Sequence, residues 1–60
     1  STHIFTVTLR LKHLGKTTEV QVVKGQREPT EHAARRAILD EYLDRGVQVV
    51  RIDRLVRESV

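Results

Sequence analysis

The chain opens with two runs in which apolar and polar residues alternate. From about residue 3 to residue 13, the odd-numbered positions 5–11 are apolar and the even-numbered positions 6–12 are polar. The second run, KTTEVQVVKG at residues 16–25, places Val20 and Val22 on one parity. A period of two is typical of a β-strand with one buried face. The pattern therefore predicts two strands, each with one side toward a core.

A Leu-Gly dipeptide at residues 14–15 separates the two runs. If these residues form the loop of a hairpin, Leu9 lies opposite Val20, and the apolar faces of the two strands coincide. The same register places Arg10 opposite Glu19 on the other face. Because Leu-Gly is not the Asn-Gly pair favoured in tight primed turns, a bulge or a longer loop is the alternative.

The GQREP segment at residues 25–29 ends the alternation, since Pro29 lacks a backbone donor and restricts the residue before it. A helix is expected to follow, with Thr30 as N-cap and Gly46 just beyond its end. Its apolar arc consists of Ala34, Ile38, Leu39, Tyr42 and Leu43. Arg35 projects from the centre of this arc. Either its side chain extends past the start of the helix, or the true phase differs by some tens of degrees.

The last segment, VQVVRIDRLVRESV at residues 47–60, is rich in β-branched residues and predicts a third strand. Its apolar residues fall on both parities. One set is Val50, Ile52 and Val56, and the other is Val47, Val49 and Leu55. We expect the first set to face the core. The mixed pattern indicates a bulge or apolar contact on both faces.

These elements predict a single small α+β domain over residues 1–60, in the order β-β-α-β. One helix packs on one face of a three-stranded sheet. The preference for right-handed crossovers makes the second and third strands parallel, with the first strand between them in the order 2-1-3. The predicted core is Phe5, Val7, Leu9, Leu11, Val20, Val22, Ile38, Leu39, Tyr42, Leu43, Val50 and Ile52.

Composition restricts the class of protein further. Sixty residues build only a small core, so the stability of an isolated chain is expected to be marginal. The chain has no cysteine, which excludes disulfides and thiolate metal sites. It contains no apolar run of about 20 residues and no signal-peptide pattern. We expect a soluble, cytoplasmic protein that does not enter the membrane.

Basic residues outnumber acidic residues by 11 to 8, and they are segregated along the chain. Residues 1–27 contain five basic residues against Glu19 alone, whereas residues 28–46 contain three basic and five acidic residues. The strands are therefore positive and the helix negative. An uncovered basic sheet face can bind nucleic acid, with cations on phosphates and shorter polar groups on phosphates or base edges. The candidate nucleic-acid-binding residues are Thr6, Thr8, Arg10, Lys12, Arg51 and Arg57.

The same face supports a rival interpretation. Apolar residues among polar ones on an uncovered sheet are typical of a homodimer or protein-partner surface. In the predicted facing, the candidate interface residues are Ile4, Val23, Val47, Val49 and Leu55. A third interpretation is that the outer row is only a solvated strand face. Small basic chains without catalytic motifs are also common among accessory proteins of phages and mobile elements.

The sequence carries no motif for catalysis, a cofactor or a metal. The three histidines are too far apart in the predicted fold to share a metal ion. The helix carboxylates Asp40, Glu41 and Asp44 are explained by a solvated face paired with arginines. A cluster at the helix start, made of Arg27, Thr30, His32 and Arg35, is an alternative anion site. We expect a non-catalytic binding module with no cofactor and no small-molecule substrate.

Overall fold

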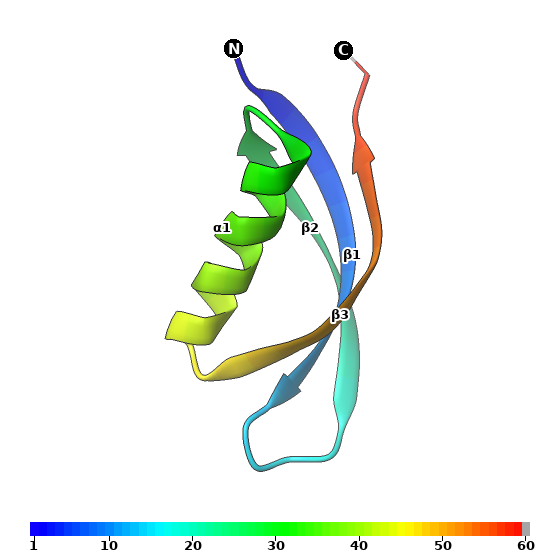
Figure 1. The fold of residues 1–60 in the computed structure, drawn as a ribbon. Helices are drawn as coiled ribbons and strands as arrows, with labels where there is room; N and C mark the ends of the chain where they lie inside the picture. Colours follow the sequence, from blue (N-terminus) through cyan, green and yellow to red (C-terminus); the bar gives the residue numbers. More distant parts are fainter. Residues whose placement is uncertain (60) are drawn as a thin grey trace.

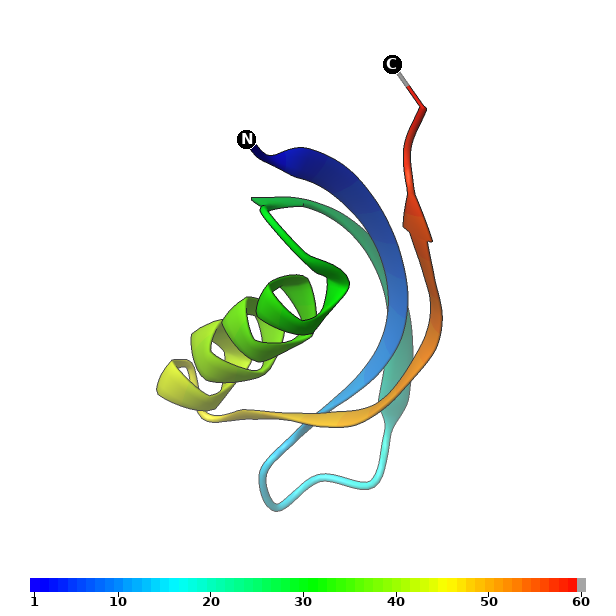
Figure 2. The same cartoon turned by 45° about the horizontal axis from the view of Figure 1, so that its top comes forward.

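A computed structural model describes residues 1–59 of the chain. Strands β1 (His3–His13) and β2 (Glu19–Glu28) form a hairpin, followed by helix α1 (Glu31–Asp44) and strand β3 (Val47–Arg57). Both outer strands pair antiparallel to β1, in the order β2-β1-β3. The predicted β-β-α-β fold and strand order are confirmed. Figures 1 and 2 show a strongly curved sheet with α1 on its concave face.

The hairpin register differs from the predicted one by two residues. Leu9 lies opposite Val22, and Arg10 lies opposite Gln21. The reason is the connection, which is a loop over residues 14–18 instead of a two-residue turn. Gly15 takes a positive φ of 80° within it. Because the shift is an even number of residues, each side chain keeps its predicted face.

Helix α1 begins and ends where the sequence predicts. The Thr30 side chain accepts a hydrogen bond from the backbone N–H of Ala33 at 3.1 Å, and Gly46 follows the last turn with φ 70°. The rotation of the helix about its axis differs from the predicted one, because the buried residues of the helix are Ala34 and Ile38. Arg35 accordingly points into solvent and bonds Glu31 at 3.3 Å. The rotated phase thus explains why an arginine stands in the apolar arc of the sequence.

The structure overturns part of the predicted core. Leu39 and Leu43 are 42% and 71% exposed, and Val20 on β2 is 51% exposed. The helix buries Ala34 and Ile38, so both leucines lie outside its buried face. The buried core consists of Phe5, Val7, Leu9, Leu11, Ala34 and Ile38, and the residues packed against it are Val22, Tyr42, Val47, Val49, Ile52 and Leu55.

Strand β3 contains two register shifts, and they reverse the predicted facing. Val47, Val49 and Leu55 lie opposite core-facing residues of β1 and pack against the core. The expectation that these three face outward is therefore wrong. Val56 lies opposite Thr6 on the other face, and Val50 lies at a register shift. Each shift adds an unpaired residue and changes the parity of the strand beyond it, which the pattern indicated only as a bulge.

Among residues 1–59, no helix is long and apolar enough to cross a membrane.

Candidate nucleic-acid interface

The convex face of the sheet is the surface that no other element covers. Helix α1 lies on the opposite, concave face, as Figure 2 shows. The β1 residues on the convex face are Ile4, Thr6, Thr8, Arg10 and Lys12. Their partners on β2 include Glu19, Gln21, Val23 and Arg27, and those on β3 are Gln48, Arg51, Arg54 and Val56. Basic and short polar side chains therefore dominate this face.

Five of the six residues predicted to bind nucleic acid come together on this face: Thr6, Thr8, Arg10, Lys12 and Arg51. Arg57 does not, because it lies opposite Phe5 and so belongs to the helix side. Arg54, which the sequence interpretation left out, takes its place on the convex face opposite Thr8. The irregularity between Thr8 and Leu9 causes this exchange.

A charged cluster occupies the middle of the convex face. Arg10 and Arg51 are direct partners across the β1–β3 ladder. Asp53 bridges them, with one carboxylate oxygen 2.6 Å from Arg51 Nε and the other 4.0 Å from Arg10 Nε. Glu19 approaches Arg10 from β2 at 4.0 Å. Two carboxylates thus balance the two cations at the centre.

The two arginines differ in their surroundings. Arg51 is exposed, and its hydrogen bond from Nε to Asp53, together with the charge of that carboxylate, raises the pKa of Arg51. Arg10 is half-buried, and its Nε is buried without a hydrogen-bond acceptor in reach. Lys12 and Arg54 form no ion pair with any residue of the described part of the chain. These two cations are therefore free to meet an external anion.

Only part of the apolar interface predicted from the sequence lies on the convex face of the structure. Ile4 and Val23 are on the convex face as predicted and are 38% and 67% exposed. Val47, Val49 and Leu55 pack against the core, so they are removed from the candidate interface. Val56 joins the face instead. Scattered apolar residues of this kind do not form one continuous patch.

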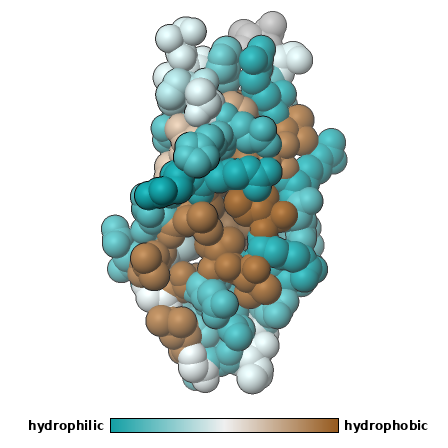
Figure 3. Space-filling view, viewed as in Figure 1, coloured by the Kyte–Doolittle hydropathy of each residue, from teal (hydrophilic) through white to brown (hydrophobic). Residues whose placement is uncertain are grey.

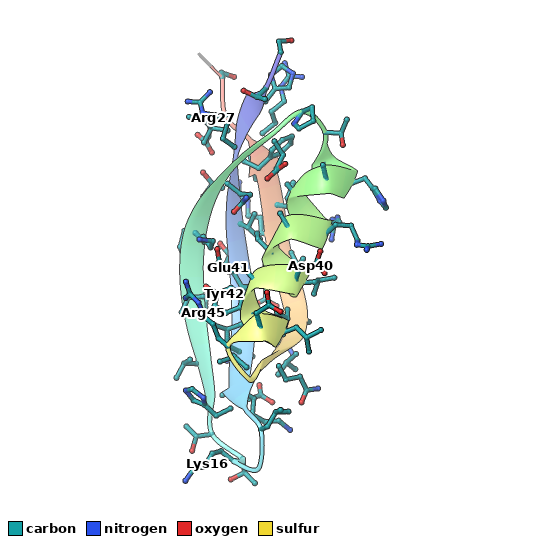
Figure 4. All side chains as sticks on the ribbon, turned by 90° about the vertical axis from the view of Figure 1, so that its left-hand side faces the viewer. Lys16, Arg27, Asp40, Glu41, Tyr42 and Arg45 are labelled. Carbon is teal, nitrogen blue, oxygen red and sulfur yellow. The ribbon has the colours of Figure 1, made fainter. Side chains whose placement is uncertain are left out.

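The structure also shows an apolar region that the sequence did not predict, at the C-terminal end of α1. A groove of about 580 Å³ on the β2 side includes Leu11, Val20, Tyr42, Val47, Lys16 and Arg45 in its wall, and Figure 4 shows Tyr42 and Arg45 there. A second groove is lined by Leu14, Leu39, Leu43, Val47, Gln48 and Val49. Figure 3 shows hydrophobic side chains gathered over the lower half of the helix and the start of β3. The signal for this region in the sequence is the apolar arc of the helix, which is too wide to be covered by the contact with the sheet.

The other candidate sites are not assembled. Within residues 1–59, no three His, Asp or Glu side chains are grouped so that they would hold a metal ion. At the start of α1, Thr30 caps the helix and Arg35 bonds Glu31. Arg27 donates to Thr2 at 3.4 Å. Of the groups of the alternative anion site, Arg27, Thr30 and Arg35 are thus engaged with partners in the chain.

Comparison of this chain with protein-family models, with curated proteins and with solved structures finds no significant match.

Proposed function

We propose that this protein is a non-catalytic binding module whose convex sheet face binds a nucleic-acid duplex. The observation that carries the proposal is an excess of cations on a face that no other element covers. The cations on it are Arg10, Lys12, Arg27, Arg51 and Arg54, against the acids Glu19, Asp53 and Glu58. Cations arranged on one face provide the electrostatic attraction to phosphates on which non-specific nucleic-acid binding depends.

Shape favours a duplex as the partner. The sheet is convex where the cations lie, and neighbouring strand axes are about 4.8 Å apart, so the three strands are about 10 Å across. This width is close to that of the DNA major groove, at about 12 Å. The molecule is 39 Å long, comparable with one helical turn of duplex at about 34–36 Å. Thr6, Thr8 and Gln21 lie among the cations and supply groups that can bond to phosphates or base edges.

Single-stranded partners are less favoured. Proteins that bind single strands stack bases on aromatic side chains. The chain has one phenylalanine, one tyrosine and no tryptophan. Phe5 is in the core, and Tyr42 packs against it from the helix. The convex face therefore offers phosphate contacts but no aromatic platform.

We place this binding in the cytoplasm, where nucleic acid is accessible.

The test is an NMR titration of the amide-labelled protein with a mixed-sequence DNA duplex at low and at moderate salt. Shifts confined to residues 6–12 and 48–54, weakening steeply with salt, are the expected result. The double variant Arg10→Glu/Lys12→Glu is expected to lose binding while keeping its fold. Arg36→Glu/Arg45→Glu on the helix makes the same charge change away from the face and serves as the matched control. Equal losses in both double variants would refute the assignment of the face.

A second candidate is a module that binds another protein chain through the same face. The exposed Ile4 and Val23, together with Val56 on the same face, favour it. This candidate predicts that Val23→Asp changes complex formation while Arg10→Glu/Lys12→Glu does not. The same pair of variants thus separates the two functions.

A further inference from the structure

The two free edges of the sheet are built differently. Strand β3 is interrupted by two register shifts, and bulges of this kind protect an edge against pairing with another chain. Strand β2 pairs with β1 without interruption from Glu19 to Glu28. Between these residues it contains no proline. The β2 edge is therefore regular over ten residues, with backbone groups available for a further strand.

The usual charge protection of such an edge is also weakened. Lysine on an edge strand discourages pairing. On β2 the only lysine is Lys24, whose Nζ lies 3.1 Å from a carboxylate oxygen of Glu41. Figure 4 shows Glu41 on the side of α1 that faces β2. The ammonium group is thus drawn toward the helix and neutralised there.

Apolar side chains flank this edge on both faces of the sheet. Val20 is 51% exposed on the concave side, and Val23 is 67% exposed on the convex side. Between them Val22 packs against the core only in part. A strand added at this edge would cover all three, which no element among residues 1–59 does.

The sequence of β2 is complementary to itself in one antiparallel register. On the convex side β2 presents Glu19, Gln21, Val23, Gly25 and Arg27. When Val23 of one chain is opposite Val23 of a second chain, Glu19 of each lies opposite Arg27 of the other, and opposite charges at such positions stabilise the pairing. Gly25, where an added Cβ would meet nothing within 4 Å, then lies opposite Gln21. Moving the register by two residues in one direction brings Glu19 opposite Gly25. Moving it by two in the other direction carries Glu19 past Arg27 and beyond the end of the partner strand. In both cases the two ion pairs are lost.

We propose that two copies of this chain pair through their β2 edges, antiparallel and centred on Val23, to form a continuous six-stranded sheet. A two-fold axis midway between the two Val23 residues, perpendicular to the sheet, makes the interface isologous, so each contact away from the axis occurs twice. Both helices then lie on the same face, and the two convex faces lie side by side. The pairing is independent of the proposed nucleic-acid binding, because it uses the edge and is measured without any nucleic acid.

The experiment determines the mass of the protein in solution by light scattering or sedimentation at increasing concentration. About twice the 6.9 kDa of one chain is expected for the unmodified protein. Arg27→Glu places two carboxylates opposite each other at both ends of the interface. It is expected to raise the dissociation constant of the dimer by about tenfold or more. The double variant Glu19→Arg/Arg27→Glu restores the opposite charges and is expected to recover the dimer. Arg36→Glu, which changes the charge equally on the helix, is expected to remain dimeric.

A mixed sample of isotope-labelled and unlabelled chains gives a second measurement that needs no variant. Contacts between Val23 methyl groups of different chains are expected in filtered NOE spectra. A chain that stays at 6.9 kDa at millimolar concentration overturns the proposal. So does a dimer that lacks contacts between the Val23 methyl groups, or one whose dissociation constant Arg27→Glu leaves unchanged.

Discussion

Arg10 and Arg51 lie directly opposite each other across the central ladder of the sheet, and the carboxylate of Asp53 joins them from the convex side. Like charges in such a position lower the stability of a sheet. Asp53 falls at the register shift of β3, where it has no partner on β1, and its side chain lies between the two guanidinium groups. The two cations are thus held together by an acid that also reduces the positive potential of the face.

Replacing Asp53 by asparagine is predicted to separate stability from binding. Asp53→Asn removes the carboxylate that bridges Arg10 and Arg51, so the midpoint of urea unfolding is expected to fall. The convex face gains one net positive charge, so affinity for a DNA duplex is expected to rise severalfold at low salt. Asp40→Asn, on the exposed side of the helix, is the control and is expected to change neither quantity. A fall in affinity for Asp53→Asn would show that the acid orients Arg51 for binding.

The helix gives a second prediction, based on its phase. Ile38 is fully buried and Leu43 is 71% exposed, although both are large aliphatic residues of one amphipathic segment. Ile38→Ala is expected to cost about 2–5 kcal/mol of unfolding free energy, by lost burial and a residual cavity. Leu43→Ala is expected to change it by less than about 0.5 kcal/mol. Urea unfolding followed by circular dichroism measures both, and similar losses in the two variants would contradict the observed phase.

The difference between these two residues shows how far the sequence determines the helix. Its ends follow from local chemistry, because Thr30 supplies the cap and Gly46 supplies the positive φ beyond the last turn. Its phase does not, because the apolar arc is wider than the surface that the sheet covers. Ala34, which is fully buried in the core, has too small a side chain to stand out in a hydrophobic pattern.

For the strands, too, part of the structure follows from the sequence and part does not. The alternation over β1 identified the strand and its buried side, since its core positions stay in register throughout. On β3 the inward positions are Val47, Val49, Ile52 and Leu55, whose spacing changes from two residues to three. No strict alternation describes that series, so Val47, Val49, Leu55 and Arg57 were predicted on the wrong face. The register of the hairpin was missed because a five-residue loop has no signature as specific as Asn-Gly.

Replacing glycine by alanine is predicted to change the unfolding free energy in opposite directions at Gly46 and Gly25. Gly46→Ala places a Cβ at φ 70°, and we expect it to lower the unfolding free energy by about 1 kcal/mol. Gly25→Ala adds a Cβ that meets nothing within 4 Å, at a β-strand position without positive φ. It is expected to raise stability by about 0.4–1 kcal/mol by restricting the unfolded chain. Thermal and urea unfolding at one fixed protein concentration measure both. A loss of stability in Gly25→Ala would indicate a close backbone approach at the β2 edge.

The two faces of β3 give the last prediction, which is the most direct test of the site. Arg54 and Arg57 are three residues apart in a stretch of β3 without a register shift, so Arg54 lies opposite Thr8 on the convex face and Arg57 lies opposite Phe5 on the helix side. If the convex face contacts phosphates, Arg54→Gln removes one contact. The slope of log affinity against log salt concentration is then expected to fall by about 1. Arg57→Gln carries the same loss of charge and is expected to leave that slope unchanged. Titration of a fluorescent duplex at four salt concentrations measures the slopes. If the two variants behave alike, the binding depends on net charge alone and not on the curved face.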